Sequence, residues 1–181
     1  MNPHVWIAIT SLAVAASPAA AQERQPDFTG EWSLVDSAAV APSVATRGDA
    51  AFRVGDMGSG WGSRITLTHE PDRLTVEYVY FSTYDLQPPL EYLYALDGSE
   101  SINHIMIGHS ASEQRSRAAW QGATLVITTR YAAPEMGRGA QTAEVRQSLH
   151  MAAPDRLEIE TTRVGVNGAP TTVTRTVYIR N

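Results

Sequence analysis

The stretch SRAAWQGATLVITTRY, Ser116 to Tyr131, decides the fold. Two runs of alternating apolar and polar residues meet there at Gln121-Gly122, a pattern typical of a β-hairpin. A two-residue turn at this dipeptide predicts three cross-strand pairs on one face: Trp120 with Ala123, Ala118 with Leu125, and Ser116 with Ile127. That face is largely apolar. It has to be buried against another layer, as in the wall of a sandwich or barrel.

Similar alternating runs and turn signals flank this hairpin. Pro71-Asp72, Asp97-Gly98 and Asn167-Gly168 each separate two such runs and predict further hairpins. We expect about ten strands, at residues 27–35, 63–69, 73–81, 90–96, 102–107, 116–120, 123–131, 143–150, 155–164 and 171–180. An even-numbered antiparallel meander can close on itself and pair every edge. The sequence therefore predicts an all-β, antiparallel up-and-down barrel of about 8–10 strands.

The N-terminus has the pattern of an export signal. Val5 to Ala16 is an apolar run, and Ala19-Ala20-Ala21 precedes Gln22 as a small-residue cleavage site. The run is shorter than the roughly 20 apolar residues of a transmembrane helix, and we expect no membrane span elsewhere. The chain is thus predicted to comprise a signal peptide, residues 1–21, and a single β-barrel domain, residues 22–181, located in the periplasm or secreted.

Composition excludes several classes of function. The 181 residues include no cysteine, so a disulfide framework, a thiol nucleophile and a zinc–thiolate site are all excluded. All fourteen basic residues are arginine, which excludes Schiff-base lysine chemistry. The net charge is −5 and no basic run is present, so we expect no nucleic-acid partner. We also expect no cofactor.

Several segments together resemble a known group of proteins. These segments are DFTGEW, YDLQPPL, YALDGSES, SRAAWQGATLVITTR and TRTVYIRN. They resemble a widespread group of exported bacterial proteins with lipocalin-like, calycin-type barrels. In the calycins a Trp in an opening Gly-x-Trp closes one end of the barrel, and Gly30 and Trp32 match that pattern. The resemblance implies a barrel that binds small, mostly apolar ligands, and it implies no catalytic residues.

Tyrosines are concentrated between two predicted strands and their linker. One interpretation is core packing, because tyrosine is common on half-buried strands. The other is an aromatic-lined cavity whose hydroxyl groups orient a ligand. The residues that keep the alternation of one face are Tyr78, Tyr80, Tyr92 and Tyr94.

The connections predict where a ligand enters. In an antiparallel meander, connections after odd-numbered strands share one end and those after even-numbered strands share the other. The longer connections follow the odd-numbered strands, so we expect the mouth at their end. Our rim candidates there are Trp61, Tyr84, Asp85 and His109. We also expect His69 and His150 to be exposed, because each precedes a turn.

Histidine spacing argues against a metal site. His104 and His109 are five residues apart, so on one uninterrupted strand they point to opposite faces. We therefore predict no metal. Either histidine remains a candidate general base near the mouth.

Three functions remain open. The first is binding of a small apolar or aromatic molecule outside the cytoplasm, by Trp61, Tyr78, Tyr80, Tyr84, Asp85, Tyr92, Tyr94, His104 and His109. The second is a cofactor-free lyase, isomerase or hydrolase that uses His and Tyr as acid and base inside the barrel. The third is a structural or inhibitory binding protein, which would present an exposed apolar patch.

Overall fold

The computed structural model describes most of the barrel. It covers residues 25–39, 60–78, 89–107, 110–133, 141–164 and 170–181. The predicted residues Tyr80, Tyr84, Asp85 and His109 and the predicted signal peptide lie outside these ranges. None of the described residues forms a helix long and apolar enough to span a membrane.

Ten antiparallel strands form one sheet. In chain order they are β1 (Gly30–Ala39), β2 (Arg64–His69), β3 (Arg73–Tyr78), β4 (Leu90–Ala95), β5 (Glu100–Ile107), β6 (Ser110–Gln121), β7 (Thr124–Ala133), β8 (Gln141–Ala153), β9 (Arg156–Arg163) and β10 (Thr172–Arg180). Their order across the sheet is β4-β3-β2-β1-β10-β9-β8-β7-β6-β5. This arrangement confirms the predicted fold class, a nearly closed up-and-down barrel.

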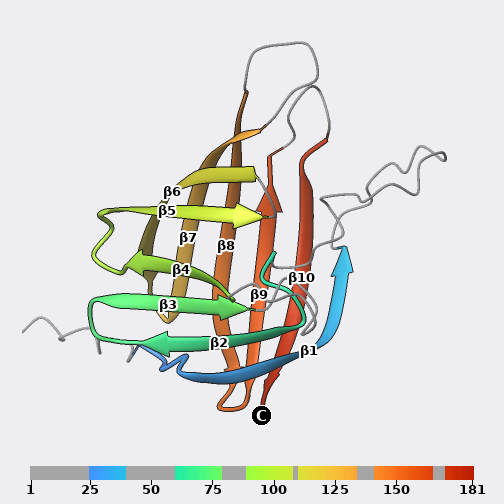
Figure 1. The fold of residues 1–181 in the computed structure, drawn as a ribbon. Helices are drawn as coiled ribbons and strands as arrows, with labels where there is room; N and C mark the ends of the chain where they lie inside the picture. Colours follow the sequence, from blue (N-terminus) through green and yellow to red (C-terminus); the bar gives the residue numbers. More distant parts are fainter. Residues whose placement is uncertain (1–24, 40–59, 79–88, 108–109, 134–140, 165–169) are drawn as a thin grey trace, which may run out of the picture.

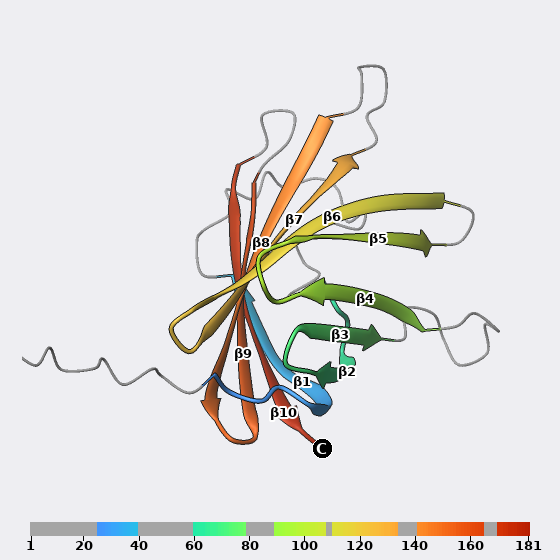
Figure 2. The same ribbon diagram turned by 90° about the vertical axis from the view of Figure 1, so that its left-hand side faces the viewer.

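The barrel is flattened into two walls. Strands β2 to β5 form one wall and run across strands β7 to β10, which form the other (Figure 1). Seen from the side, the two walls diverge from each other, and the long strands β1 and β6 curve from one into the other (Figure 2). Such crossing of strands is typical of orthogonal packing, in which a curved sheet continues around a corner. The core lies between the walls.

The register of the central hairpin differs from the prediction. Gln121 pairs with Thr124, so the turn is Gly122-Ala123, and Trp120 pairs with Leu125 instead of Ala123. Gly122 has a φ of 62°, which lies in the left-handed region that glycine adopts readily and that two-residue hairpin turns require at their first position. A shift of two residues preserves which side chains share a face. The buried face is therefore the one predicted, and only the pairs are wrong.

The two strands that Asp97-Gly98 connects do not pair through backbone hydrogen bonds, so the hairpin predicted there is wrong. Nine pairs of strands are joined by backbone ladders, but β4 and β5, which this turn connects, are the two edges of the sheet. Side chains of β5 join these edges instead. The Asn103 amide accepts a hydrogen bond from Leu93 N (2.8 Å) and donates one to Leu93 O (3.0 Å). Ser101 Oγ accepts a third from Ala95 N (2.8 Å). We call this junction the β4–β5 seam.

The short connections gather at one end of the barrel. Leu96 N donates to Asp72 O (2.8 Å), which joins the β2–β3 and β4–β5 turns, and Gly98 N donates to Ala118 O (3.0 Å). Arg180 N donates to Asp155 O (2.9 Å), which joins the end of β10 to the β8–β9 turn. We call this the tight-turn end. Four connections after even-numbered strands therefore share one end, as the sequence predicted.

Candidate functional site

The interior changes character along the barrel axis. Cross-strand partners on the inward face of β6 to β10 form three successive rows. Of these three, the row nearest the tight-turn end is Trp120, Leu125, Leu149, Ile159 and Thr176. The next is Ala118, Ile127, Gln147, Thr161 and Thr174. The third is Ser116, Thr129, Val145, Arg163 and Thr172. Polar side chains thus replace apolar ones with distance from the tight-turn end, and we call the second and third rows the polar rows.

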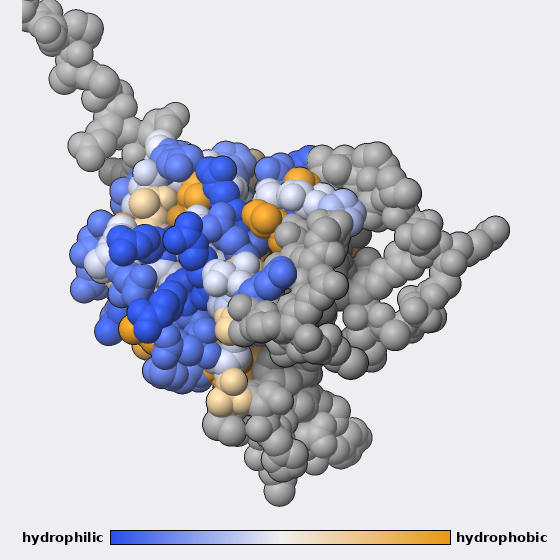
Figure 3. Space-filling view, turned by 90° about the horizontal axis from the view of Figure 1, so that it is seen from above, coloured by the Kyte–Doolittle hydropathy of each residue, from blue (hydrophilic) through white to orange (hydrophobic). Residues whose placement is uncertain are grey.

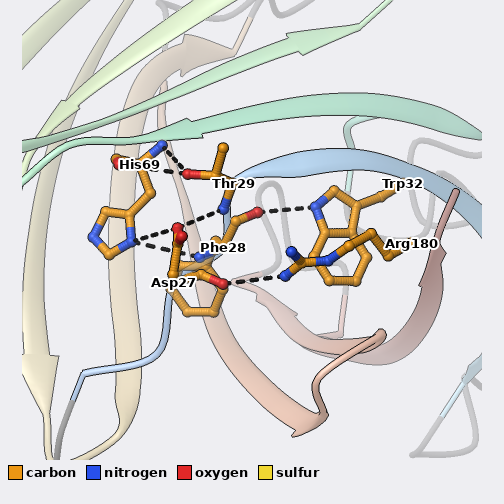
Figure 4. Close-up of polar contacts among 6 residues, drawn as sticks. All are labelled: Asp27, Phe28, Thr29, Trp32, His69 and Arg180. Carbon is orange, nitrogen blue, oxygen red and sulfur yellow. Dashed lines mark hydrogen bonds and ion pairs between the residues drawn. The ribbon is translucent and has the colours of Figure 1, made fainter.

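The chain that precedes β1 closes the tight-turn end. Phe28 is fully buried and its ring stacks on Trp120, with centroids 5.6 Å apart. Its carbonyl oxygen accepts a hydrogen bond from Trp32 Nε1 (2.9 Å), and Thr29 N donates to Asp27 Oδ1 (2.8 Å). Figure 4 shows Asp27, Phe28, Thr29 and Trp32 side by side, with the hydrogen bonds between them. The backbone before the first strand is therefore held in place by the first strand's own tryptophan.

Arginine from the last strand completes the closure. The Arg180 guanidinium lies over the Trp32 ring, 4.6 Å from its centroid, and Arg180 donates to Asp27 O (3.2 Å). A cation over the face of an indole is attracted by the ring quadrupole. The first and last strands thus meet at Trp32, which is fully buried.

The sequence predicted that His69 is exposed, and this prediction is wrong. Only 12% of its side-chain surface is exposed, and its ring lies 5.6 Å from Phe28 and 5.8 Å from Trp120. Burial lowers the pKa of His69, although Asp27, 3.6 Å away, opposes the shift. His69 Nδ1 accepts from Phe28 N (3.5 Å), which also needs the unprotonated nitrogen. His69 is therefore neutral at neutral pH and contributes to packing.

Three of the predicted tyrosines form a buried stack on β3 and β4. The ring centroids of Tyr78 and Tyr92 are 5.9 Å apart and those of Tyr92 and Tyr94 are 6.2 Å apart, with planes within 4° of parallel. The hydroxyl oxygens of Tyr78 and Tyr92 are 3.4 Å apart. Burial, with Tyr92 nearby, raises the pKa of Tyr94 far above its usual range, while Trp61 opposes the shift by hydrogen bonding. We call these three residues the tyrosine stack.

Trp61 joins the tyrosine stack instead of lying at the rim. It is 3% exposed, and its ring lies 6.3 Å from that of Tyr94. The glycines beside it have positive φ values, 88° at Gly60 and 78° at Gly62, which favour glycine over other residues. A Cβ on Gly62 would lie at ordinary contact distance, 3.4 Å, from the Tyr78 ring, so this segment lies against the tyrosine stack.

The same short segment also contacts the opposite wall. Tyr178 on β10 donates its hydroxyl hydrogen to Gly62 O (2.7 Å), and a Cβ on Gly60 would lie 3.6 Å from Arg163 Nη2. Burial lowers the pKa of the Arg163 guanidinium. Residues 60–62 therefore lie between the tyrosine stack and the wall of β9 and β10.

The polar rows were not predicted as part of a site. Seven polar residues are buried in the described part of the chain: Asn103, Ser116, Thr129, Gln147, Thr161, Thr174 and Thr176. Ser116 and Thr129 share a hydrogen bond (2.9 Å). A sequence signal was present in TTVTRTVY, residues 171–178, where threonine occupies the alternate positions that face inward. Threonine suits either face of a strand, so the alternation by itself did not reveal its burial.

His104 lies on the outer face of β5. It is exposed and pairs across the sheet with Glu113, while its neighbour Asn103 points inward. His104 is thus separated from the tyrosine stack by the wall of the barrel. In the described part of the chain, no group of three or more His, Cys, Asp or Glu side chains is placed to hold a metal ion.

Comparison with known proteins adds no functional assignment. No protein-family model matches the chain, and no curated protein is similar to it.

Proposed function

We propose that the barrel binds a small aromatic molecule beside the tyrosine stack. The observation that carries this proposal is the tyrosine stack itself, together with Trp61. Parallel buried rings offer a flat apolar surface on which another aromatic ring gains both burial and favourable ring–ring geometry. Each tyrosine also brings a hydroxyl group to the interior, which can orient a ligand by hydrogen bonding.

The hydrophilic character of the described surface supports a binding site in the interior. The described surface in Figure 3 is mostly hydrophilic, with a few separate apolar residues. The exposed large apolar side chains in the described ranges are Leu34, Val35, Leu93, Ile102 and Val164. A few exposed apolar residues are ordinary for a protein surface, whereas a docking face needs a large contiguous patch. They favour ligand binding inside the barrel over an inhibitory or structural binding role.

The catalytic alternative has less support. General acid–base chemistry in the barrel needs a histidine within hydrogen-bond reach of a tyrosine hydroxyl or carboxylate in the interior. His104 is on the outer face, and His69 is packed against Phe28 and Trp120 at the closed end. We therefore favour binding without chemistry.

A fluorescent probe tests the binding proposal. N-phenylnaphthylamine should bind the refolded or exported protein saturably and quench the fluorescence of Trp61. Tyr92→Leu removes the middle ring of the tyrosine stack and should weaken probe binding by about three- to tenfold. Leu93→Ser, on the outer face of the same strand, is the matched control and should leave affinity unchanged. Absence of saturable binding, or equal affinity of Tyr92→Leu and the parent, would refute the proposal.

We further propose that the protein acts outside the cytoplasm. Support comes from the apolar run at Val5 to Ala16 and the small residues before Gln22. The barrel strands begin at Gly30, so cleavage after Ala21 leaves all ten intact. Intact mass of protein recovered from the exported fraction should correspond to a chain that starts at Gln22. Retention of residues 1–21 would contradict this proposal.

A further inference from the structure

Trp61 belongs to a connection, whereas the rings of the tyrosine stack belong to paired strands. Gly60 and Trp61 form a turn shortly before β2 begins at Arg64. The three tyrosines lie in the backbone ladder that joins β3 to β4. The position of the indole ring therefore depends on a short segment outside the sheet, while the stack is fixed by the sheet itself.

The residues on either side of Trp61 allow its backbone to change conformation. Gly60 and Gly62 have φ values of 88° and 78°. Glycine adopts positive and negative φ about equally readily, so each of them can act as a pivot. The chain is fixed again directly after them, because Ser63 O accepts a hydrogen bond from Leu34 N of β1 (2.8 Å). Trp61 can therefore move while β2 stays in place.

Trp61 and Gly62 cover the tyrosine stack on the side that faces the wall of β9 and β10. The indole ring lies 6.3 Å from the Tyr94 ring, and its N–H is hydrogen-bonded to the Tyr94 hydroxyl. Gly62 lies against the Tyr78 ring. Protein interiors are close-packed, so a further aromatic ring finds no room in this place while the indole fills it. A ligand that binds there has to take the place of the indole.

A hydrogen bond from the opposite wall holds this segment in position. The Tyr178 hydroxyl on β10 donates to Gly62 O (2.7 Å). A neutral hydrogen bond of this kind contributes only modestly to stability, because both groups can bond to water once they separate. A ligand that replaces the contacts of the indole with Tyr94 can therefore compete with the segment.

We propose that Trp61 is a displaceable plug: its indole fills the ligand's place beside the tyrosine stack, and the ligand binds when Trp61 swings out about Gly60 and Gly62. This inference rests on the proposed function and adds the conformational change that binding requires. The aromatic ring of the ligand takes over the contact of the indole with Tyr94. Because only the open form binds, the fraction of open molecules limits the apparent affinity.

The solvent exposure of Trp61 tests the plug directly. Protein labelled with fluorotryptophan gives a fluorine resonance for each tryptophan, and the resonance that is lost in Trp61→Phe is that of Trp61. Without probe, this resonance should differ little between light and heavy water, because Trp61 is 3% exposed. Saturation with N-phenylnaphthylamine should raise the solvent isotope shift toward the value of the unfolded protein. The resonances of Trp32 and Trp120, at the closed end, should not change.

Removal of the Tyr178 hydroxyl tests the same equilibrium by affinity. Tyr178→Phe loses the hydrogen bond to Gly62 O and leaves all rings of the tyrosine stack in place. It should tighten probe binding about two- to fivefold, because more molecules are open. Thr176→Val is the matched control on the same strand. It removes a buried hydroxyl without a described partner and should leave the affinity unchanged.

The outcomes separate the plug from the proposed function. If the probe binds saturably and Tyr92→Leu weakens its binding, but the Trp61 resonance stays shielded at saturation, Trp61 is a fixed part of the site and only the plug is refuted. Equal or weaker binding by Tyr178→Phe counts against the plug in the same way. If neither the parent nor Tyr178→Phe binds the probe, the proposed function fails and the plug fails with it. Should Tyr178→Phe not fold, the fluorine measurement on the parent decides alone.

Discussion

The two ends of the barrel interior are built in opposite ways. At the tight-turn end, Phe28, Trp32 and Trp120 pack in direct contact, and Trp32 Nε1 is bonded within the cluster. Further along the axis, the inward rows carry hydroxyl and amide groups, and one of them, Thr161 Oγ1, lacks a partner in the described residues. The first arrangement maximises stability. The second keeps buried polar groups at some cost in stability, which is typical of functional sites.

The largest expected effect is at the closed end. Phe28→Ala removes a fully buried ring that stacks on Trp120, and should lower the free energy of unfolding by about 3–5 kcal/mol. Chemical denaturation followed by circular dichroism measures this loss. The control Leu93→Ala, at an exposed position, should cost much less. A small loss for Phe28→Ala would mean that the segment before β1 does not close the barrel.

The β4–β5 seam should show the next largest effect. Asn103→Leu removes an amide that bonds both Leu93 N and Leu93 O, which leaves a donor and an acceptor without their protein partner. We expect a loss of about 1–3 kcal/mol and faster hydrogen exchange of the Leu93 amide. Ser101→Ala removes a single bond and should cost less. Unchanged exchange at Leu93 would show that the seam does not depend on Asn103.

A smaller effect should appear as a pH dependence of stability. Burial lowers the pKa of His69 in the folded protein, so below about pH 6.5 the unfolded chain binds the proton more readily. Stability should therefore fall as pH decreases from about 7.5 through 6.5, and level off below the lowered pKa. Melting temperatures of the parent and His69→Gln test this, because the variant should show a shallower fall. His104→Gln, on the outer face, should behave as the parent does.

The smallest expected effect is a gain, not a loss, in the free energy of unfolding. Thr161→Val replaces a buried hydroxyl without a described partner by a methyl group of similar size. We expect the unliganded protein to be unchanged or stabilised by up to about 1 kcal/mol. A marked loss of stability in a denaturation experiment would show that the hydroxyl has a structural role, and would remove the contrast between the two ends.

Much of the fold followed from local pattern. Alternation of apolar and polar residues, with Pro-Asp and Asp-Gly turn signals, predicted ten strands and the alternation of short connections. The same alternation placed Tyr78, Tyr92 and Tyr94 on one face. The central register was wrong by two residues, because a glycine with positive φ can begin a turn at its own position as well as end one.

The sequence by itself therefore determined the strands, their antiparallel order and the shared face of the tyrosines, because these depend on residues close together in the chain. Tertiary structure alone decided where the sheet has its edges, since Asp97-Gly98 permits a hairpin but Asn103 completes the junction with side-chain bonds. It also decided that Trp61 is buried, that most of the His69 side chain is covered, and that β8, β9 and β10 present polar groups to the interior. Burial depends on which distant strands face each other, and a two-residue period specifies the two faces of a strand without identifying the one that points inward.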